Sequence, residues 1–121
     1  MKHKKTGRQL SRTRNQRRAL MKTLLGSLIL HERITTTEAK AKEIKNNIDQ
    51  VVKKAKVART DKDKEVASLR DLRKYIPKVA MEKIVGEFGV RFDDRTSGFI
   101  RITKLEARKS DSARMAVIEF V

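Results

Sequence analysis

The sequence contains no cysteine, and this absence excludes several kinds of site and fold. A chain without cysteine has no disulfide framework and no cysteine-bound zinc or iron–sulfur cluster. No apolar run approaches the roughly 18 residues of a membrane span, and none follows the basic start closely enough to make a signal peptide. These absences favour a reducing, cytosol-like compartment.

Residue patterns that carry catalysis are also scarce. The two histidines, His3 and His31, lie far apart and lack the serine or aspartate neighbours of a catalytic triad. No glycine-rich loop has the Walker or Rossmann spacing that binds nucleotide phosphates. Aromatic residues make up only 4% of the chain, which argues against extensive stacking of nucleic-acid bases. The sequence therefore predicts no enzymatic activity, no cofactor and no metal site.

One pair of carboxylates is adjacent in the sequence, Asp93 and Asp94, within an arginine-, aspartate- and glycine-rich segment at residues 90–98. A metal site would need further oxygen ligands close by. Because Arg91 and Arg95 flank the pair, we predict instead a loop whose charges neutralise one another.

Negative charge is missing from the start of the chain. The sequence has 31 basic and 15 acidic residues, a net charge of +16, and residues 1–22 hold nine basic residues but no acidic one. Like charges at this density resist packing without a polyanion. We therefore expect residues 1–11 to form a basic arm that orders on nucleic acid. A solubilising tail and a binder of anionic membranes are the alternatives.

The first helix is expected over about residues 12–31, with Ser11 as its cap. Its first half is rich in arginine, and its second half carries a leucine- and methionine-rich stripe at helical spacing. Charge and apolar residues are thus separated along the helix more than across it. A helix lying on a membrane surface would separate them by face, so this pattern argues against membrane binding.

A short β-branched run at 34–37 predicts an edge strand. The helix expected over about 37–58, capped by a threonine, has the clearest apolar stripe in the chain. The stripe consists of Ala41, Ile44, Ile48, Val51, Val52, Ala55 and Ala58. Lysines 42, 45, 53 and 56 lie opposite the stripe and are consistent equally with a solvated face and with RNA contact.

The second half of the chain predicts two more helices and a hairpin. Asp63 is the expected cap of a helix over about 64–75, which would bury Val66, and Pro77 is expected to begin a fourth helix. Strands are expected at 99–105 and 115–121, joined by a long polar loop. Residues 12–121 should therefore form a single α+β domain, with about four helices on one face of a small sheet.

Motifs along essentially the whole chain resemble a known family, bacterial-type ribosomal protein seventeen of the large subunit. They are Met1-Lys2-His3-Lys4-Lys5, Gly7-Arg8, Leu10, Arg12, Arg17, Ala19-Leu20, Ser27-Leu28, the run from His31 to Glu43, Asp49, Val51-Val52, Ala55-Lys56, the run from Ser97 to Ile102, Arg108, Asp111, Ala113, and the end from Ile118 to Val121. The threonine-centred run is the most specific. Departures from the family pattern occur at Gln16, Thr23, Lys53, Ser97 to Arg101 and Ser110.

The resemblance implies an α+β fold in which about four helices pack on a small mixed three-stranded sheet, with a basic N-terminal extension. It also implies a structural protein that binds and stabilises folded large-subunit ribosomal RNA through the basic arm and a basic surface. It also implies neighbouring large-subunit ribosomal proteins as partners and a place near the opening of the peptide exit tunnel. The family pattern begins at Met1, which favours the cytoplasm of a bacterium over an organelle. No membrane and no small-molecule substrate are expected.

The residues expected to bind RNA are basic side chains of the arm, the first helix and the second half of the chain. They are Lys2, His3, Lys4, Lys5, Arg8, Arg12, Arg14, Arg17, Arg18, Lys22, Arg95, Arg101 and Arg108. Charge alone would equally suit a DNA-compacting protein. A membrane-active or protein-interaction module built on the first helix and an RNA-processing enzyme are further alternatives, and the enzyme has the least support.

Overall fold

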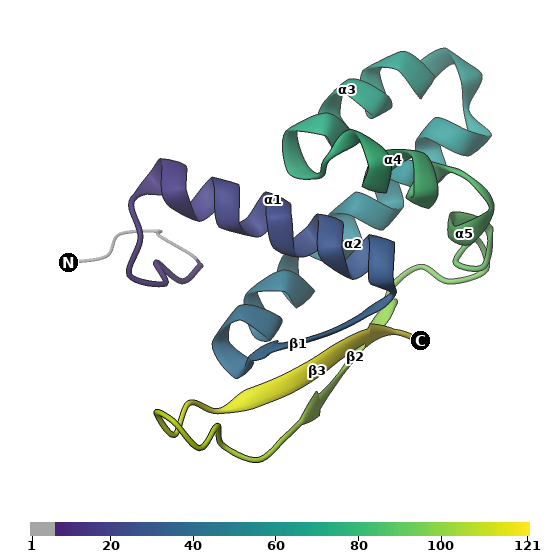
Figure 1. The fold of residues 1–121 in the computed structure, drawn as a ribbon. Coiled ribbons are helices and arrows are strands. Elements are labelled where there is room, and N and C mark those ends of the chain that lie inside the picture. The colour runs from purple at the N-terminus through teal and green to yellow at the C-terminus, as the bar shows by residue number, and fades with distance from the viewer. Residues whose placement is uncertain (1–6) are drawn as a thin grey trace.

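The computed structural model describes residues 7–121. These residues form five α-helices, one short 3-10 helix and three strands. In chain order the elements are α1 (Arg14–His31), β1 (Arg33–Thr37), α2 (Glu38–Thr60), η1 (Lys62–Lys64), α3 (Glu65–Tyr75), α4 (Lys78–Val85), α5 (Glu87–Val90), β2 (Ile100–Lys104) and β3 (Met115–Phe120). Figure 1 shows the helices gathered on one side of the sheet. The predicted α+β class and the edge position of β1 are confirmed.

The sheet has the strand order β1-β3-β2, and both pairings are antiparallel. A mixed sheet was expected, and this detail is wrong. β2 and β3 are antiparallel because a hairpin loop joins them. β1 pairs with the other edge of β3 and is also antiparallel to it, so no parallel pair is formed. Alternate residues of β3 then point to opposite faces, so Ala116, Ile118 and Phe120 enter the core.

The core lies between this face of the sheet and the two long helices. Every residue of the predicted α2 stripe is buried, and Leu25, Leu28 and Ile29 of α1 join the same cluster. The prediction for α2 succeeded because a long amphipathic helix buries its apolar stripe in any α+β packing. Val66 of α3 is different, since it is 61% exposed where burial was expected. α3 reaches the core through the buried Leu72, and the half-buried Leu69 packs against it.

Two predicted helix caps are wrong. Thr13, not Ser11, caps α1: its hydroxyl accepts from the Gln16 N–H, and the Gln16 side chain accepts from the Thr13 N–H. Ser11 has φ +56°, whereas a capping residue needs an extended backbone. Asp63 does not cap α3, whose cap position is Lys64 without a side-chain hydrogen bond. Instead the Asp61 carboxylate accepts from the Asp63 N–H at the start of η1.

The helices beyond α2 are held by one close crossing and one aromatic cluster. As predicted, α4 begins directly after Pro77, and Gly86 ends it. A Cβ on Gly26 would lie 2.7 Å from the Pro77 ring, so glycine lets α1 touch the start of α4. The four phenylalanines of the chain, Phe88, Phe92, Phe99 and Phe120, pack against one another with ring centroids 5.1–5.7 Å apart. The aromatic cluster ties α5 and the segment after it to the sheet.

Candidate nucleic-acid interface

A groove of about 590 Å³ lies where α1, α2 and α3 meet. It is lined by Arg17, Arg18, Met21, Lys22 and Leu25 of α1, Glu43 and Asn47 of α2, and Lys74 and Tyr75 of α3. Four of these side chains are cationic and one is anionic, so the groove attracts anions. We call it the basic groove.

The cations that α1 contributes to the basic groove are not neutralised by the fold. Among residues 7–121, no acidic side chain lies within 4.0 Å of Arg17, Arg18 or Lys22, and Arg14 one turn earlier is also without an acidic partner. This follows from the division of α1 along its length. Its second half buries Leu25, Gly26, Leu28 and Ile29, and Figure 1 shows its first half extending away from α5 and the C-terminus. The cations of this first half are therefore available to a partner molecule.

A second basic recess, of about 340 Å³, lies at the start of α2. Arg8, Lys42 and Arg114 line it together with Glu38. A hydrogen bond from Lys42 is the main cause that holds the pKa of Glu38 below its ordinary value. Arg8 also lies 4.0 Å from Glu43, so this residue of the predicted arm contacts α2. The recess places Arg8 beside Arg114, two residues that are remote in sequence.

Arg12, also predicted to bind RNA, is half-buried near the start of α1 and donates to the Leu10 carbonyl at 2.7 Å. The remaining members of the predicted set within the arm, Lys2, His3, Lys4 and Lys5, lie outside the described residues.

Arg101 lies on the outer face of the sheet rather than near the basic groove. The register aligns Arg33, Glu119 and Arg101 in one row across the three strands. Arg101 donates two bonds to the Glu119 carboxylate, at 3.1 and 2.7 Å, and Arg33 lies 3.7 Å from it. The hydrogen bond from Arg101 is the main cause that lowers the pKa of Glu119. The row carries two cations for one anion, so it keeps one positive charge.

Arg108 lies in the loop between β2 and β3, where it folds back on its own segment. Its guanidinium donates to both Asp111 carboxylate oxygens, at 2.9 and 2.6 Å, and the Ala113 N–H donates to the same carboxylate at 3.1 Å. The hydrogen bond from Arg108 is the larger cause that lowers the pKa of Asp111 to about 2. Arg108 therefore organises the loop before it meets any partner.

We expect an NMR titration of the carboxylates to give Asp111 a pKa of about 2, against an ordinary value of 3.8. The folded pKa is the lower one, so the loop interaction is fully present above pH 3.8 and is lost as the pH falls through about 2. In Arg108→Gln the Asp111 pKa should return toward its ordinary value. A pKa of Asp111 that is the same with and without Arg108 would contradict this assignment.

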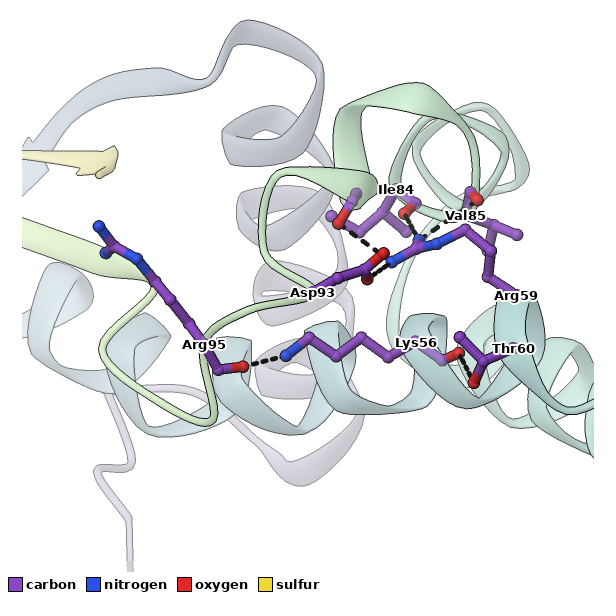
Figure 2. Close-up of polar contacts among 8 residues, drawn as sticks. Lys56, Arg59, Thr60, Ile84, Val85, Asp93 and Arg95 are labelled. Carbon is purple, nitrogen blue, oxygen red and sulfur yellow. Dashed lines mark hydrogen bonds and ion pairs between the residues drawn. The ribbon is translucent and has the colours of Figure 1, made fainter.

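Arg95 lies near the far end of α2, away from the basic groove. Its guanidinium donates to the Gly98 carbonyl at 3.3 Å, and its own carbonyl accepts from the Lys56 ammonium, as Figure 2 shows. The lysine row of α2 is thus divided between roles: Lys56 ties down this loop, Lys42 pairs with Glu38 at 2.9 Å, and the other two members are exposed.

The prediction of a self-neutralising loop at residues 90–98 is wrong. Asp93 pairs with Arg59 of α2, and Arg91 pairs with Glu32 at 3.5 Å and donates to the Val121 carbonyl at 3.1 Å. Sequence neighbours were the wrong partners, because the turns after α5 direct these side chains to other elements.

Arg59 was not singled out in the sequence, yet it makes the most connected polar cluster of the described chain. Its guanidinium donates to the Ile84 and Val85 carbonyls at 3.4 Å each, to the Gly89 carbonyl at 3.1 Å, and to Asp93 (Figure 2). The Ile84 and Val85 carbonyls lie at the end of α4, where a helix leaves carbonyls unpaired, and the Gly89 carbonyl also accepts from the Phe92 N–H. Arg59 therefore holds α4 and α5 against α2 and has a structural role. Its place on the helix, one residue after the apolar stripe, was the only signal in the sequence.

The structure thus brings together only part of the predicted RNA-binding set. Arg17, Arg18 and Lys22 share the basic groove, with Arg14 on the same helix, and Arg8 lies at the neighbouring recess. Arg95, Arg101 and Arg108 lie in three other places. The sequence interpretation missed Lys74 and Tyr75 in the groove and Arg114 in the recess, because these residues are remote from α1 along the chain.

Two further features limit what the described residues can do. No helix among residues 7–121 combines the length and the apolar character that crossing a bilayer requires. The same residues contain no group of three or more histidine, aspartate or glutamate side chains placed to hold a metal ion.

Comparison with known proteins identifies the chain. The family described as Ribosomal protein L17 matches residues 20–121. The "Large ribosomal subunit protein bL17" of Thermodesulfovibrio yellowstonii is 41% identical over 122 residues, covering 100% of this chain and 87% of that protein. Proteins of the same name from Enterococcus faecalis and Rickettsia bellii are 38% and 42% identical, covering 94% and 100% of this chain and 97% and 82% of their own lengths.

These matches show that this is a ribosomal protein, a structural component of the ribosome and not an enzyme. The chain belongs to the ribosomal protein L17 family. The resemblance seen in the sequence is therefore confirmed.

Proposed function

We propose that this protein is a structural component of the large ribosomal subunit that binds and stabilises folded large-subunit RNA. The relatives reported above are named as large-subunit proteins, which supports the large ribosomal subunit as the assembly that contains this protein. The unneutralised cations of α1 carry the RNA part of the proposal. They gather at the basic groove, whereas Arg101, Arg108 and Arg59 are paired with carboxylates or bonded to carbonyls. In this proposal residues 1–11 form a basic arm and residues 12–121 a single RNA-binding domain.

The proposed mechanism is neutralisation of closely spaced phosphates. Each lysine or arginine that contacts a phosphate releases a condensed counterion, so binding should weaken steeply with salt. Arginine forks can engage two phosphate oxygens at once or stack on an unpaired base. A basic arm can enter crevices between RNA helices that a rigid domain cannot reach. Ordering such an arm costs roughly 1–2 kcal/mol per residue, which the phosphate contacts must offset.

The family membership also supports a finer placement. We propose a cytoplasmic ribosome as the location, a position near the opening of the peptide exit tunnel, and neighbouring large-subunit proteins as partners. The outer sheet face is open among the described residues, with helices on the opposite face, and it provides a surface for such neighbours.

The test is sedimentation of a cell lysate through a sucrose gradient after a high-salt wash, with the fractions blotted for this chain. We expect it to travel with the large subunit at one copy per particle. Nuclease treatment that removes DNA but spares ribosomes should leave its position unchanged. If the chain stays at the top of the gradient or follows the DNA, the proposed function fails and general affinity for phosphate accounts for the charge.

A further inference from the structure

Tyr75 is the one aromatic residue of the chain outside the core cluster. The sequence has four phenylalanines, one tyrosine and no tryptophan, and the four phenylalanines pack against one another. Tyr75 is the last residue of α3, is 39% exposed and lines the basic groove. The groove therefore holds the only tyrosine ring of this protein, at a site where a flat ligand can reach it.

The surroundings of Tyr75 combine charge with apolar surface. The Lys54 ammonium lies 4.4 Å from the ring centroid, and Lys54 does not line the groove. Met21 and Leu25 add apolar surface inside the groove, and Asn47 adds an amide that both donates and accepts. An aromatic ring beside aliphatic side chains and an amide is the environment that a splayed-out base finds in RNA-binding proteins.

The cations of the groove are suited to a phosphate beside that base. Arg17, Arg18 and Lys22 approach from α1 without acidic partners among residues 7–121, whereas Lys74 lies 3.7 Å from Asp71. The one acid in the groove, Glu43, lies 4.0 Å from Arg8. A volume of about 590 Å³ falls within the roughly 300–1,000 Å³ of small-molecule sites.

We propose that the basic groove takes one unpaired nucleotide of RNA. Its base stacks on Tyr75, and its phosphates contact the free cations of α1. The inference rests on the proposed function and deepens it, because it makes single-stranded or bulged RNA, rather than a continuous duplex, the ligand of this surface.

The single tyrosine makes the test direct, because tyrosine emission from the full chain reports on this groove alone. Two probes of equal charge are titrated: single-stranded hexaadenylate and an abasic ribose–phosphate hexamer. We expect hexaadenylate to quench the emission saturably and to bind about tenfold more tightly than the abasic hexamer, the scale of stacking one base on an aromatic ring. Equal affinity of the two probes, or no quenching, would overturn the proposal.

Variants of Tyr75, with labelled hexamers followed by fluorescence anisotropy, separate stacking from charge. Tyr75→Leu should abolish the preference for hexaadenylate over the abasic hexamer, and Tyr75→Phe should retain it because the ring is kept. Lys62→Ala, in η1 and outside the groove, should leave the preference unchanged. Circular dichroism checks that each variant is folded, and the quenching of the unmodified protein remains decisive if one of them is not.

The outcomes also separate this inference from the proposed function. If the chain sediments with the large subunit but shows no preference for hexaadenylate, the proposed function stands and the nucleotide site is wrong. If hexaglutamate competes as well as hexaadenylate, the groove recognises charge alone and the site is again wrong. A stacking preference in a chain that never joins the subunit would refute the proposed function and keep the nucleotide site.

Discussion

Replacing Arg14, Arg17 and Arg18 together with alanine is expected to weaken binding to large-subunit RNA by about two to three orders of magnitude near 0.1 M salt. Each lost phosphate contact removes about 0.9 from the slope of log affinity against log salt, so three contacts should reduce that slope by about 2–3. The fold should survive, because none of the three has an acidic partner among residues 7–121 and alanine favours a helix. Filter binding at several salt concentrations measures both quantities.

The matched control replaces Lys62, Lys64 and Lys78 with alanine. Both triple variants lower the net charge from +16 to +13. Lys62 and Lys64 are exposed on η1, and Lys78 is exposed on α4. They should lose much less affinity than the arginine triple. Equal losses would mean that net charge, not the surface of α1, determines binding. If the arginine triple lost its helical content and its melting transition, those residues would belong to the folded body and the interface would be misassigned.

Replacing Gly89 with alanine is expected to lower the free energy of unfolding by about 3 kcal/mol. A Cβ there would lie 1.9 Å from the Ile84 carbonyl oxygen and 2.6 Å from a guanidinium nitrogen of Arg59. The backbone of α5 must move to make room, which separates the Arg59 guanidinium from the carbonyls it holds together. Urea unfolding followed by circular dichroism measures the loss.

Gly86→Ala is the comparison for Gly89→Ala, in the same short segment. The Cβ of an alanine at position 86 would lie 3.1 Å from the Glu82 carbonyl oxygen, a contact that a small backbone shift relieves. We therefore expect the free energy of unfolding to fall by about 1 kcal/mol. Similar costs for the two variants would mean that the contact between Gly89 and Arg59 does not support the fold. Because Gly89 is distant from the basic groove, RNA affinity of the folded fraction should not change in either variant.

The cations of this protein divide into two groups by what surrounds them. Arg59 binds carbonyls at the ends of α4 and α5. Lys83 donates to the Leu30 carbonyl at 2.9 Å and to Glu32 at 3.3 Å, closing the end of α1. These residues complete the fold and are not available to phosphate. Arg17, Arg18 and Lys22 of α1 line the basic groove and have no acidic partner among residues 7–121, so a count of charges alone overstates the binding surface.

The elements whose signals are local could be predicted from the sequence. The apolar stripe of α2, the start of α4 after Pro77, the hairpin and the edge strand depend on neighbours within one or two turns or one strand length, and each is confirmed. The cap of α1 was missed although Gln16, three residues after Thr13, completes a capping box with it, whereas Ser11 has a left-handed backbone. The family, too, was recognisable from motifs in order along the chain.

What required the tertiary structure was every pairing between distant segments. The partner of Asp93 is Arg59, 34 positions away, and not the arginines on either side, because α5 turns the loop back onto α2. The basic groove exists only because α3 ends beside α1, which brings Tyr75 to the arginines. Charge and periodicity in one chain determined which segments are basic and which helices bury a face. The packing of those helices determined which cations are consumed by the fold and which remain for a partner, since side chains remote in sequence meet only when the core has formed.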